Sequence, residues 1–142
     1  MKLNPNFVKK LRNSGLRPTK QRLKICEILF NTEKTFHFTI NDLSKTISEK
    51  LNEKISLATV YNTVHAFKKK GYLKEISINS DNSYFDTNTS VHHHFYDEDT
   101  QELIDCAEND IDPINVKKNI TEKKINSVEV LIRVASNNQN QN

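Results

Sequence analysis

Hydrophobic residues recur at helical spacing in four segments of the first half of the chain. The first segment spans residues 5–13 and ends at Ser14 and Gly15, and the next three each follow a capping residue, Thr19, Thr39 or Ser56. Gly71 provides a left-handed stop for the fourth segment. The pattern predicts four helices with one shared core, formed by Phe7, Val8, Leu11, Leu23, Cys26, Ile28, Leu29, Phe30, Ile40, Leu43, Ile47, Leu51, Leu57, Val60, Val64 and Phe67.

Two extended runs, YLKEISIN and SYFDTN, follow the fourth helix and are separated by the polar turn Ser80-Asp81-Asn82, which predicts a β-hairpin. Three helices, a fourth helix and a hairpin describe a winged helix-turn-helix module, which binds the major groove of DNA. The face of the fourth helix opposite its apolar stripe carries small, hydroxylated and amide residues that can approach base edges. These residues include Ala58, Thr59, Tyr61, Asn62, His65 and Lys68.

From about residue 91 the pattern changes to short strands, VHHHFY, ELIDC and SVEVLIRV, with a helix expected within residues 113–124 and SVEVLIRV expected to be a central strand. This part has about 45 residues and is too small to bury a sufficient core alone, which favours pairing with a second copy. The predicted fold class is α+β, with a winged-helix DNA-binding domain and a small α/β dimerisation domain. The predicted boundaries are residues 1–86 for the DNA-binding domain, 87–91 for a hinge, 92–135 for the dimerisation and sensing domain, and 136–142 for a disordered tail.

Charge also differs between the two halves of the chain. Of the 142 residues, positions 1–74 hold 16 Lys and Arg against 5 Asp and Glu, a net charge of +11, and positions 75–142 hold 5 against 13, a net charge of −8. A basic first half suits DNA phosphates, and an acidic second half suits cations or another protein. No apolar run approaches the roughly 20 residues that span a bilayer, so we expect a soluble, cytoplasmic protein without a membrane partner. Two cysteines 80 residues apart predict reduced thiols, with Cys26 in the core.

Histidines and carboxylates gather around the start of the second half. On a strand, His92 and His94 project from one face about 7 Å apart, and His93 points to the other face. Asp86 precedes them by six residues, and Asp105 lies in the strand ELIDC. Imidazoles and carboxylates favour divalent iron, manganese, zinc or cobalt over copper(I). A polar strand face without any ligand is almost as good an interpretation of the bare histidine tract.

The segments LRPTKQR, SLATVYNTVHAFKKKGYLKE, YFDTNTSVHHHF and ELIDC, in this order, resemble the ferric uptake regulator superfamily over residues 5–134. The resemblance implies a dimeric transcription regulator with one regulatory metal site. By matched position, the ligands of that site are His37, from the loop before the third helix, together with Asp86, His92, His94 and Asp105. Iron(II) or manganese(II) is the expected ion, and zinc(II) is expected to bind in vitro.

Three departures from the family pattern refine this interpretation. The place where zinc-stapled members carry CxxC reads FYDEDT, so no structural zinc is expected. The uninterrupted tract His92, His93 and His94 resembles the iron response regulators, a branch in which this tract is implicated in haem binding. Neither cysteine precedes a proline, however, so the haem-regulatory Cys-Pro motif of that branch is missing. Aspartate at both carboxylate positions resembles the peroxide-sensing branch instead.

The DNA-contacting residues follow from the same resemblance and from charge. Arg17 matches the basic residue that enters the minor groove, and Thr59 and Tyr61 match positions that face bases, with Tyr61 directed to thymine methyl groups. We also assign Asn62 to this face. Generic phosphate contacts are expected from Lys20, Arg22, Lys68 and Lys69.

These observations predict a metal- or haem-responsive regulator of iron homeostasis that binds operator DNA as a homodimer. The alternative within the family is a peroxide sensor in which bound iron(II) oxidises His37 or His92. A non-haem iron enzyme is disfavoured because five protein ligands leave little room for oxygen and substrate. A constitutive architectural DNA-binding protein with idle histidines is the third alternative.

Overall fold

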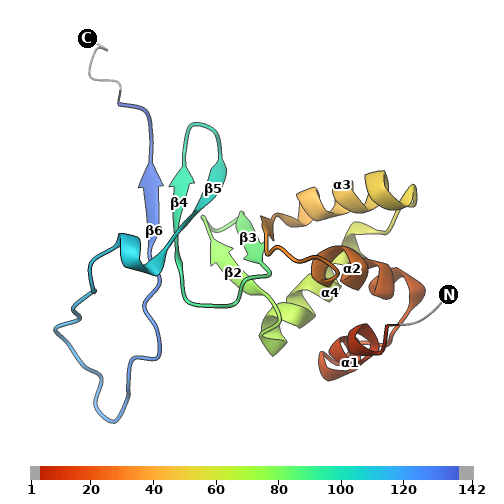
Figure 1. Cartoon of the computed structure of the whole chain (residues 1–142), viewed down its shortest axis with the longest axis horizontal. Helices are drawn as coiled ribbons and strands as arrows, with labels where there is room; N and C mark the ends of the chain where they lie inside the picture. The colour runs from red at the N-terminus through yellow and green to blue at the C-terminus, as the bar shows by residue number, and fades with distance from the viewer. Residues whose placement is uncertain (1–3, 138–142) are drawn as a thin grey trace. The chain divides into compact units, whose positions relative to one another are not determined.

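The computed structural model describes residues 4–137 and divides between Thr89 and Ser90 into two units, which are considered separately (Figure 1). The first unit contains α1 (Pro5–Asn13), α2 (Lys20–Phe30), β1 (His37–Phe38), α3 (Ile40–Leu51), α4 (Leu57–Lys70), β2 (Lys74–Ser77) and β3 (Ser83–Asp86). The second contains β4 (His93–Asp97), β5 (Glu102–Cys106), the 3-10 turn Glu108–Asp110 and β6 (Leu131–Val134). Within the described residues, no helix has the length and apolar character needed to cross a membrane.

Local capping determines where the helices of the first unit begin. The side chains of Thr19 and Ser56 accept hydrogen bonds from backbone N–H groups in the first turns of α2 and α4. Thr39 forms a capping box with Asp42 at the start of α3, in which each side chain accepts a hydrogen bond from the other residue's backbone N–H. Gly71 ends α4 with a φ of +90°. The four predicted helices are therefore confirmed.

The helices enclose a single apolar core. Its fully buried residues include Leu11, Ile25, Cys26, Leu29, Leu43, Ile47, Val60, Val64, Phe67 and Phe85. Cys26 is a core residue, as the sequence predicts, and burial raises the pKa of its thiol to about 12. The prediction for Leu57 is wrong: Leu57 is the first residue of α4 and is 53% exposed, because Ile55 fills the core at this end of the helix.

The predicted hairpin forms, and it belongs to a three-stranded antiparallel sheet with the order β1-β3-β2. The sequence did not indicate β1, which has two residues and therefore too short a pattern to show alternation. His37 lies on this strand and not in a loop, and its direct cross-strand partner on β3 is Asp86. The pairing register thus brings together two of the predicted ligands.

The second unit is a three-stranded sheet with the order β5-β4-β6. The central strand β4 is antiparallel to β5 and parallel to β6. The prediction of a central strand at SVEVLIRV is wrong, since only Leu131–Val134 forms β6 and it lies at the edge of the sheet. Of the predicted tail, residues 138–142 lie outside the described part of the chain.

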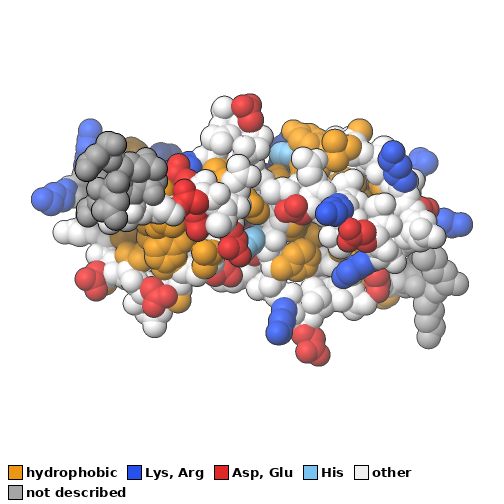
Figure 2. All heavy atoms as spheres, turned by 90° about the horizontal axis from the view of Figure 1, so that it is seen from above, with side chains coloured by type: hydrophobic (Ala, Val, Ile, Leu, Met, Phe, Trp, Pro, Cys, Tyr) orange, Lys and Arg blue, Asp and Glu red, His pale blue; other side chains and the backbone are white. Residues whose placement is uncertain are grey.

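The helix expected within residues 113–124 is absent, and residues 111–130 contain no helix or strand. The β-branched Ile114, Val116 and Ile120 are all exposed, so this stretch buries no apolar face that would stabilise a helix. Exposed hydrophobic side chains are visible as orange spheres in Figure 2. In the second unit they are Val91, Ile104, Ile114, Val116, Ile120, Ile125 and Val134.

Candidate metal centre and nucleic-acid interface

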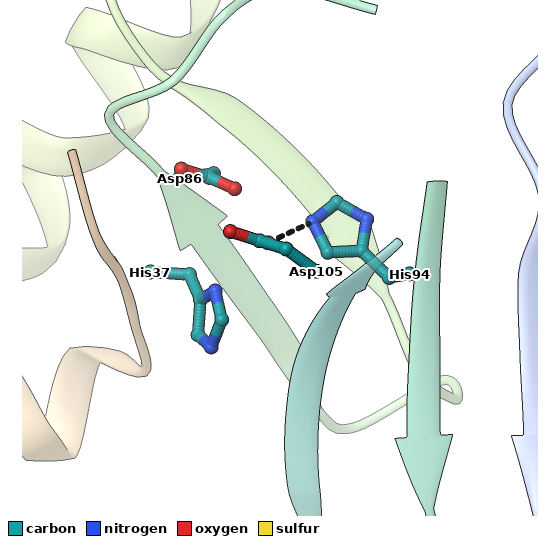
Figure 3. A group of neighbouring side chains, drawn as sticks. All are labelled: His37, Asp86, His94 and Asp105. Carbon is teal, nitrogen blue, oxygen red and sulfur yellow. Dashed lines mark ion pairs between the residues drawn. The ribbon is translucent and has the colours of Figure 1, made fainter. Parts of the chain in front are cut away.

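The first unit carries two of the predicted ligands, which we call the N-terminal half-site: His37 on β1 and Asp86 on β3. They are direct partners in the antiparallel ladder, and a ring nitrogen of His37 lies within 4.8 Å of a carboxylate oxygen of Asp86 (Figure 3). Asp86 is almost fully buried, and its Oδ1 accepts a hydrogen bond of 2.8 Å from the Asn88 backbone N–H. A buried carboxylate beside an imidazole is a pair of donors suited to a divalent cation.

The second unit carries the other three predicted ligands, which we call the C-terminal half-site: His92, His94 and Asp105. Asp105 on β5 is the direct cross-strand partner of His94 on β4. Its Oδ1 lies 3.3 Å from Nε2 of His94, an ion pair drawn dashed in Figure 3, and 3.7 Å from Nε2 of His92. The two imidazole ring centroids are 4.4 Å apart. Both Nε2 atoms are therefore close to the same carboxylate oxygen.

One backbone contact fixes how His92 presents its ring. Its Nδ1 lies 2.8 Å from the Ser90 carbonyl oxygen, and since a carbonyl only accepts, Nδ1 carries the proton. In a neutral His92 with this tautomer, Nε2 is the acceptor nitrogen, and it lies 3.7 Å from Oδ1 of Asp105. Such a hydrogen bond behind a ligating imidazole is the usual arrangement in protein metal sites, because it sets both the tautomer and the ring orientation.

His93 has a different role. It is buried, and its Nδ1 accepts a hydrogen bond of 3.0 Å from the Val130 backbone N–H, which ties β4 to the chain entering β6. Its cross-strand partner is Cys106, not Asp105. Alternation along β4 thus separates His93 from the C-terminal half-site.

The predicted DNA-contacting residues all lie in the first unit. Arg17 is exposed in the loop before α2, and its carbonyl oxygen accepts hydrogen bonds from the Thr19 backbone N–H and from Nη1 of Arg22. Arg22 therefore supports the loop that carries Arg17. Lys20, at the start of α2, is exposed.

The exposed face of α4 carries most of the remaining set. Tyr61 is 50% exposed, and Asn62, Lys68 and Lys69 are also exposed. Thr59 is half-buried, and its hydroxyl accepts a hydrogen bond from Ser56, so its polar group already takes part in the helix cap. Lys68 forms an ion pair of 3.2 Å with Glu75.

The sequence placed the fifth histidine, His65, on the polar face of the fourth helix but did not indicate its contact with Tyr61. Its ring packs against Tyr61 with a centroid distance of 4.0 Å. The available signal was the spacing of four residues between Tyr61 and His65, which places the two side chains next to each other on a helix.

A winged-helix unit with a basic recognition face, joined to a strand-rich unit with a histidine and aspartate cluster, defines the class of sensor-type DNA-binding proteins. The chain belongs to the ferric uptake regulator family, whose model matches residues 13–134. Members of this family are transcription regulators and not enzymes, which confirms the expectation that this chain is not an enzyme.

Two curated relatives are regulators of the peroxide response. The peroxide operon regulator of Bacillus subtilis is 36% identical over 95 residues, covering 67% of this chain and 63% of that protein. The peroxide-responsive repressor PerR of Staphylococcus epidermidis is 35% identical over 95 residues, covering 67% of this chain and 61% of that protein. The chain therefore spans less than two thirds of the length of these relatives.

Two solved structures share the fold. The ferric uptake regulator from Pseudomonas aeruginosa with manganese superposes with a TM-score of 0.66 at 21% identity, covering 92% of this chain and 97% of that one. The regulator from Vibrio cholerae gives a TM-score of 0.67 at 22% identity, covering 91% of this chain and 98% of that one. These comparisons confirm the predicted fold class.

Proposed function

We propose that this chain is a metal-dependent transcription regulator that binds operator DNA as a homodimer, and that metal occupancy sets its affinity for DNA. The observation that carries the proposal is the C-terminal half-site, in which His92 and His94 direct Nε2 atoms to one Asp105 oxygen. The first unit acts as the DNA-binding domain and the second as the dimerisation and sensing domain.

In this proposal the two half-sites bind the same cation. The N-terminal half-site offers two donors and the C-terminal half-site offers three, so neither fills the coordination sphere of a divalent ion by itself. Asp86 and His92 are six residues apart, which limits their separation to about 20 Å even in a fully extended chain. This short connection keeps each half-site at a high effective concentration relative to the other.

The donor set favours iron(II) or manganese(II), with zinc(II) as a competitor in vitro. Three imidazole nitrogens and two carboxylates are borderline to hard ligands and include no thiolate. When bound, the cation restrains the hinge between the two units. A state preferred by about 1–3 kcal/mol changes DNA affinity about 5- to 150-fold.

DNA binding in this proposal uses the basic first unit. Its charge of +11 over residues 1–74, from 16 basic and 5 acidic residues, supplies phosphate attraction. Arg17 reaches the minor groove and α4 enters the major groove, with Tyr61 and Asn62 at the bases and Lys20, Arg22, Lys68 and Lys69 at phosphates. Thr59 contributes to base contact through its methyl group, because its hydroxyl is bonded to Ser56.

Dimerisation uses the second unit. Its buried hydrophobic residues are few, among them Leu103 and Cys106, while several isoleucines and valines of the same unit are exposed. Exposed hydrophobic residues on so small a unit favour burial against a second copy.

Peroxide sensing is a second candidate function, favoured by the similarity to peroxide regulators and by aspartate at both carboxylate positions. In that case iron(II) held by the two half-sites would supply the electrons to reduce peroxide, and the ring of His37 or His92 would gain one oxygen atom. Mass spectrometry of the peptides after peroxide treatment tests it: a gain of one oxygen mass on either peptide, dependent on iron(II), supports peroxide sensing, and unmodified peptides contradict it.

Haem is the third effector to be tested. A response to haem would favour a role of this regulator in iron homeostasis. The tract His92, His93 and His94 motivates it, but two of its rings face Asp105 and His93 accepts a hydrogen bond from Val130. A Soret band of haem-loaded protein that is unchanged in a His93→Ala variant argues against haem ligation by His93.

The main test is a DNA-binding titration of the full chain. A duplex is first selected from a randomised pool, and its affinity is measured by fluorescence anisotropy with EDTA, manganese(II), anaerobic iron(II) or haem. We expect one of the metals to raise or lower affinity at least about 5-fold. His92→Ala abolishes this response, and Glu102→Gln, which alters an exposed carboxylate on the same strand as Asp105, leaves it intact. Equal affinities in all four conditions contradict the proposal.

A further inference from the structure

The side chain of His65 lies between two aromatic rings of different exposure, Tyr61 at 50% and Phe85 at 2%. On one side is Tyr61, one helical turn earlier on α4, at a centroid distance of 4.0 Å and an interplanar angle of 35°. On the other side is Phe85 of β3, at 5.3 Å in an edge-to-face arrangement of 78°. The imidazole thus connects the ring of Tyr61 to the sheet.

Phe85 gives this arrangement a fixed base. It is 2% exposed and belongs to the core of the first unit, where its ring also stacks on Phe38 at 6.1 Å. Its strand is held between β1 and β2, so Phe85 has hydrogen-bonded neighbours on both sides. His65 itself is half-buried and rests on this base.

Tyr61 is 50% exposed and borders open space. Hollows lie on both sides of it: one of about 330 Å³, lined also by Thr39, Glu75 and Asp81, and one of about 490 Å³, lined also by Asn62 and Lys69. Tyr61 and His65 line both hollows, and their rings pack against each other at an interplanar angle of 35°. An exposed tyrosine ring in such a place samples several rotamers unless a neighbour fixes it.

We propose that His65 is a positioning residue for DNA recognition: it holds the ring of Tyr61 in the orientation that contacts a thymine methyl group. The inference rests on the proposed DNA-binding function and adds a residue that acts without touching DNA. Held in this way, the ring of Tyr61 favours thymine over pyrimidines without a 5-methyl group, because its face makes apolar contact with that methyl group in the major groove. Preorganising Tyr61 also removes the entropy cost of fixing its ring on binding.

A double-mutant cycle separates positioning from direct contact. The full chain and its His65→Ala, Tyr61→Ala and doubly substituted variants are titrated with the selected duplex. We expect His65→Ala to weaken binding about 2- to 12-fold, the range for loss of a stacked aromatic pair, and to have no further effect in the Tyr61→Ala background. His65→Phe retains a ring and restores most of the affinity, and His65→Gln, which retains polarity without a ring, does not.

Replacing thymine by deoxyuridine in the duplex provides the specificity readout. Wild-type protein and His65→Phe should lose affinity on this replacement, and His65→Gln should lose much less, because an unfixed Tyr61 no longer depends on the methyl group. Thermal melts show whether each variant folds, and the comparison of His65→Phe with His65→Gln stands even where the alanine variant does not fold.

Three results overturn the inference. The first is wild-type DNA affinity of His65→Gln. The second is a loss of DNA affinity on His65→Ala that is as large in the Tyr61→Ala background as in the wild type. The third is failure of His65→Phe to restore DNA affinity. Failure of the proposed DNA-binding function gives a different result from failure of this inference, because the wild-type chain then retains no duplex in the selection.

Discussion

The substitution Asp105→Asn removes one negative charge from the C-terminal half-site at constant size. Oδ1 of Asp105 lies 3.3 Å from Nε2 of His94 and 3.7 Å from Nε2 of His92, so a cation held by both imidazoles is also close to this oxygen. The asparagine side chain keeps an oxygen acceptor but not the charge. Any loss of metal affinity therefore reports the charge of the carboxylate.

The expected magnitude follows from distance and exposure. Two unit charges 4 Å apart interact by about 1 kcal/mol in water, and a divalent ion at about half that distance raises this to roughly 4 kcal/mol. Asp105 has a side chain that is 58% exposed, so the high-dielectric value applies, and desolvation of the carboxylate and ion offsets part of it. We expect a net loss of about 1.4–2.8 kcal/mol, which is a 10- to 100-fold weaker manganese(II) affinity.

The assay is a competition titration of manganese(II) between the full chain and a fluorescent chelator. Glu102→Gln is the matched control, since it removes the same charge from an exposed position on the same strand. We expect Glu102→Gln to bind manganese(II) like the wild type. If both substitutions weaken manganese(II) binding equally, Asp105 acts only through the net charge of the strand. If Asp105→Asn binds manganese(II) with wild-type affinity, Asp105 is not a ligand.

Further predictions concern the stability of the first unit. Thr39→Ala removes one half of the capping box of α3 and should lower the free energy of unfolding by about 1 kcal/mol in urea titrations. Folding raises the thiol pKa of Cys26 from 9.0 to about 12. The buried neutral thiol therefore contributes its full share to the free energy of unfolding below pH 9, and this share is lost between pH 9 and 12. In that range the free energy of unfolding of the wild type should fall by up to about 1.4 kcal/mol more per pH unit than that of Cys26→Ala. Burial raises the pKa of Glu75, but hydrogen bonds from Ser83 and Lys68 outweigh it and leave the pKa below 4.5. The ionised Glu75 therefore contributes to the free energy of unfolding above pH 4.5, and this contribution is lost as the pH falls further. Between pH 5 and 3 the melting temperature of Glu75→Gln should fall less than that of the wild type.

Much of the first unit follows from local sequence rules. Thr19, Thr39 and Ser56 each accept a backbone hydrogen bond at the start of a helix, and Gly71 ends the fourth with a positive φ. These signals act within a few residues and need no knowledge of tertiary structure. The four helices and the hairpin could therefore be predicted from the sequence.

The errors occur where tertiary contacts decide the structure. The strand β1 exists because β3 pairs with it, and its two residues carry no pattern of their own. Ile55 and not Leu57 enters the core, a choice made by packing at the end of α4. Residues 113–124 are all exposed and gain no buried apolar face that would stabilise a helix.

The candidate site was predictable in part for a similar reason. Period-two alternation places His92 and His94 together and His93 apart, and the hydrogen bond between His93 and Val130 agrees with this separation. The pairing of His37 with Asp86 depends on strand register across 49 positions of sequence, which alternation cannot supply, and it came from the family resemblance. The role of His65 depends on the three-dimensional position of Phe85.

The central claim is that one cation joins the two half-sites. The most direct test is anomalous diffraction from crystals of the full chain grown with manganese(II), measured on both sides of the manganese absorption edge. The account predicts an anomalous peak bounded by His37 and Asp86 together with His92, His94 and Asp105. Manganese bound by the residues of one half-site alone, or away from both half-sites, would contradict it.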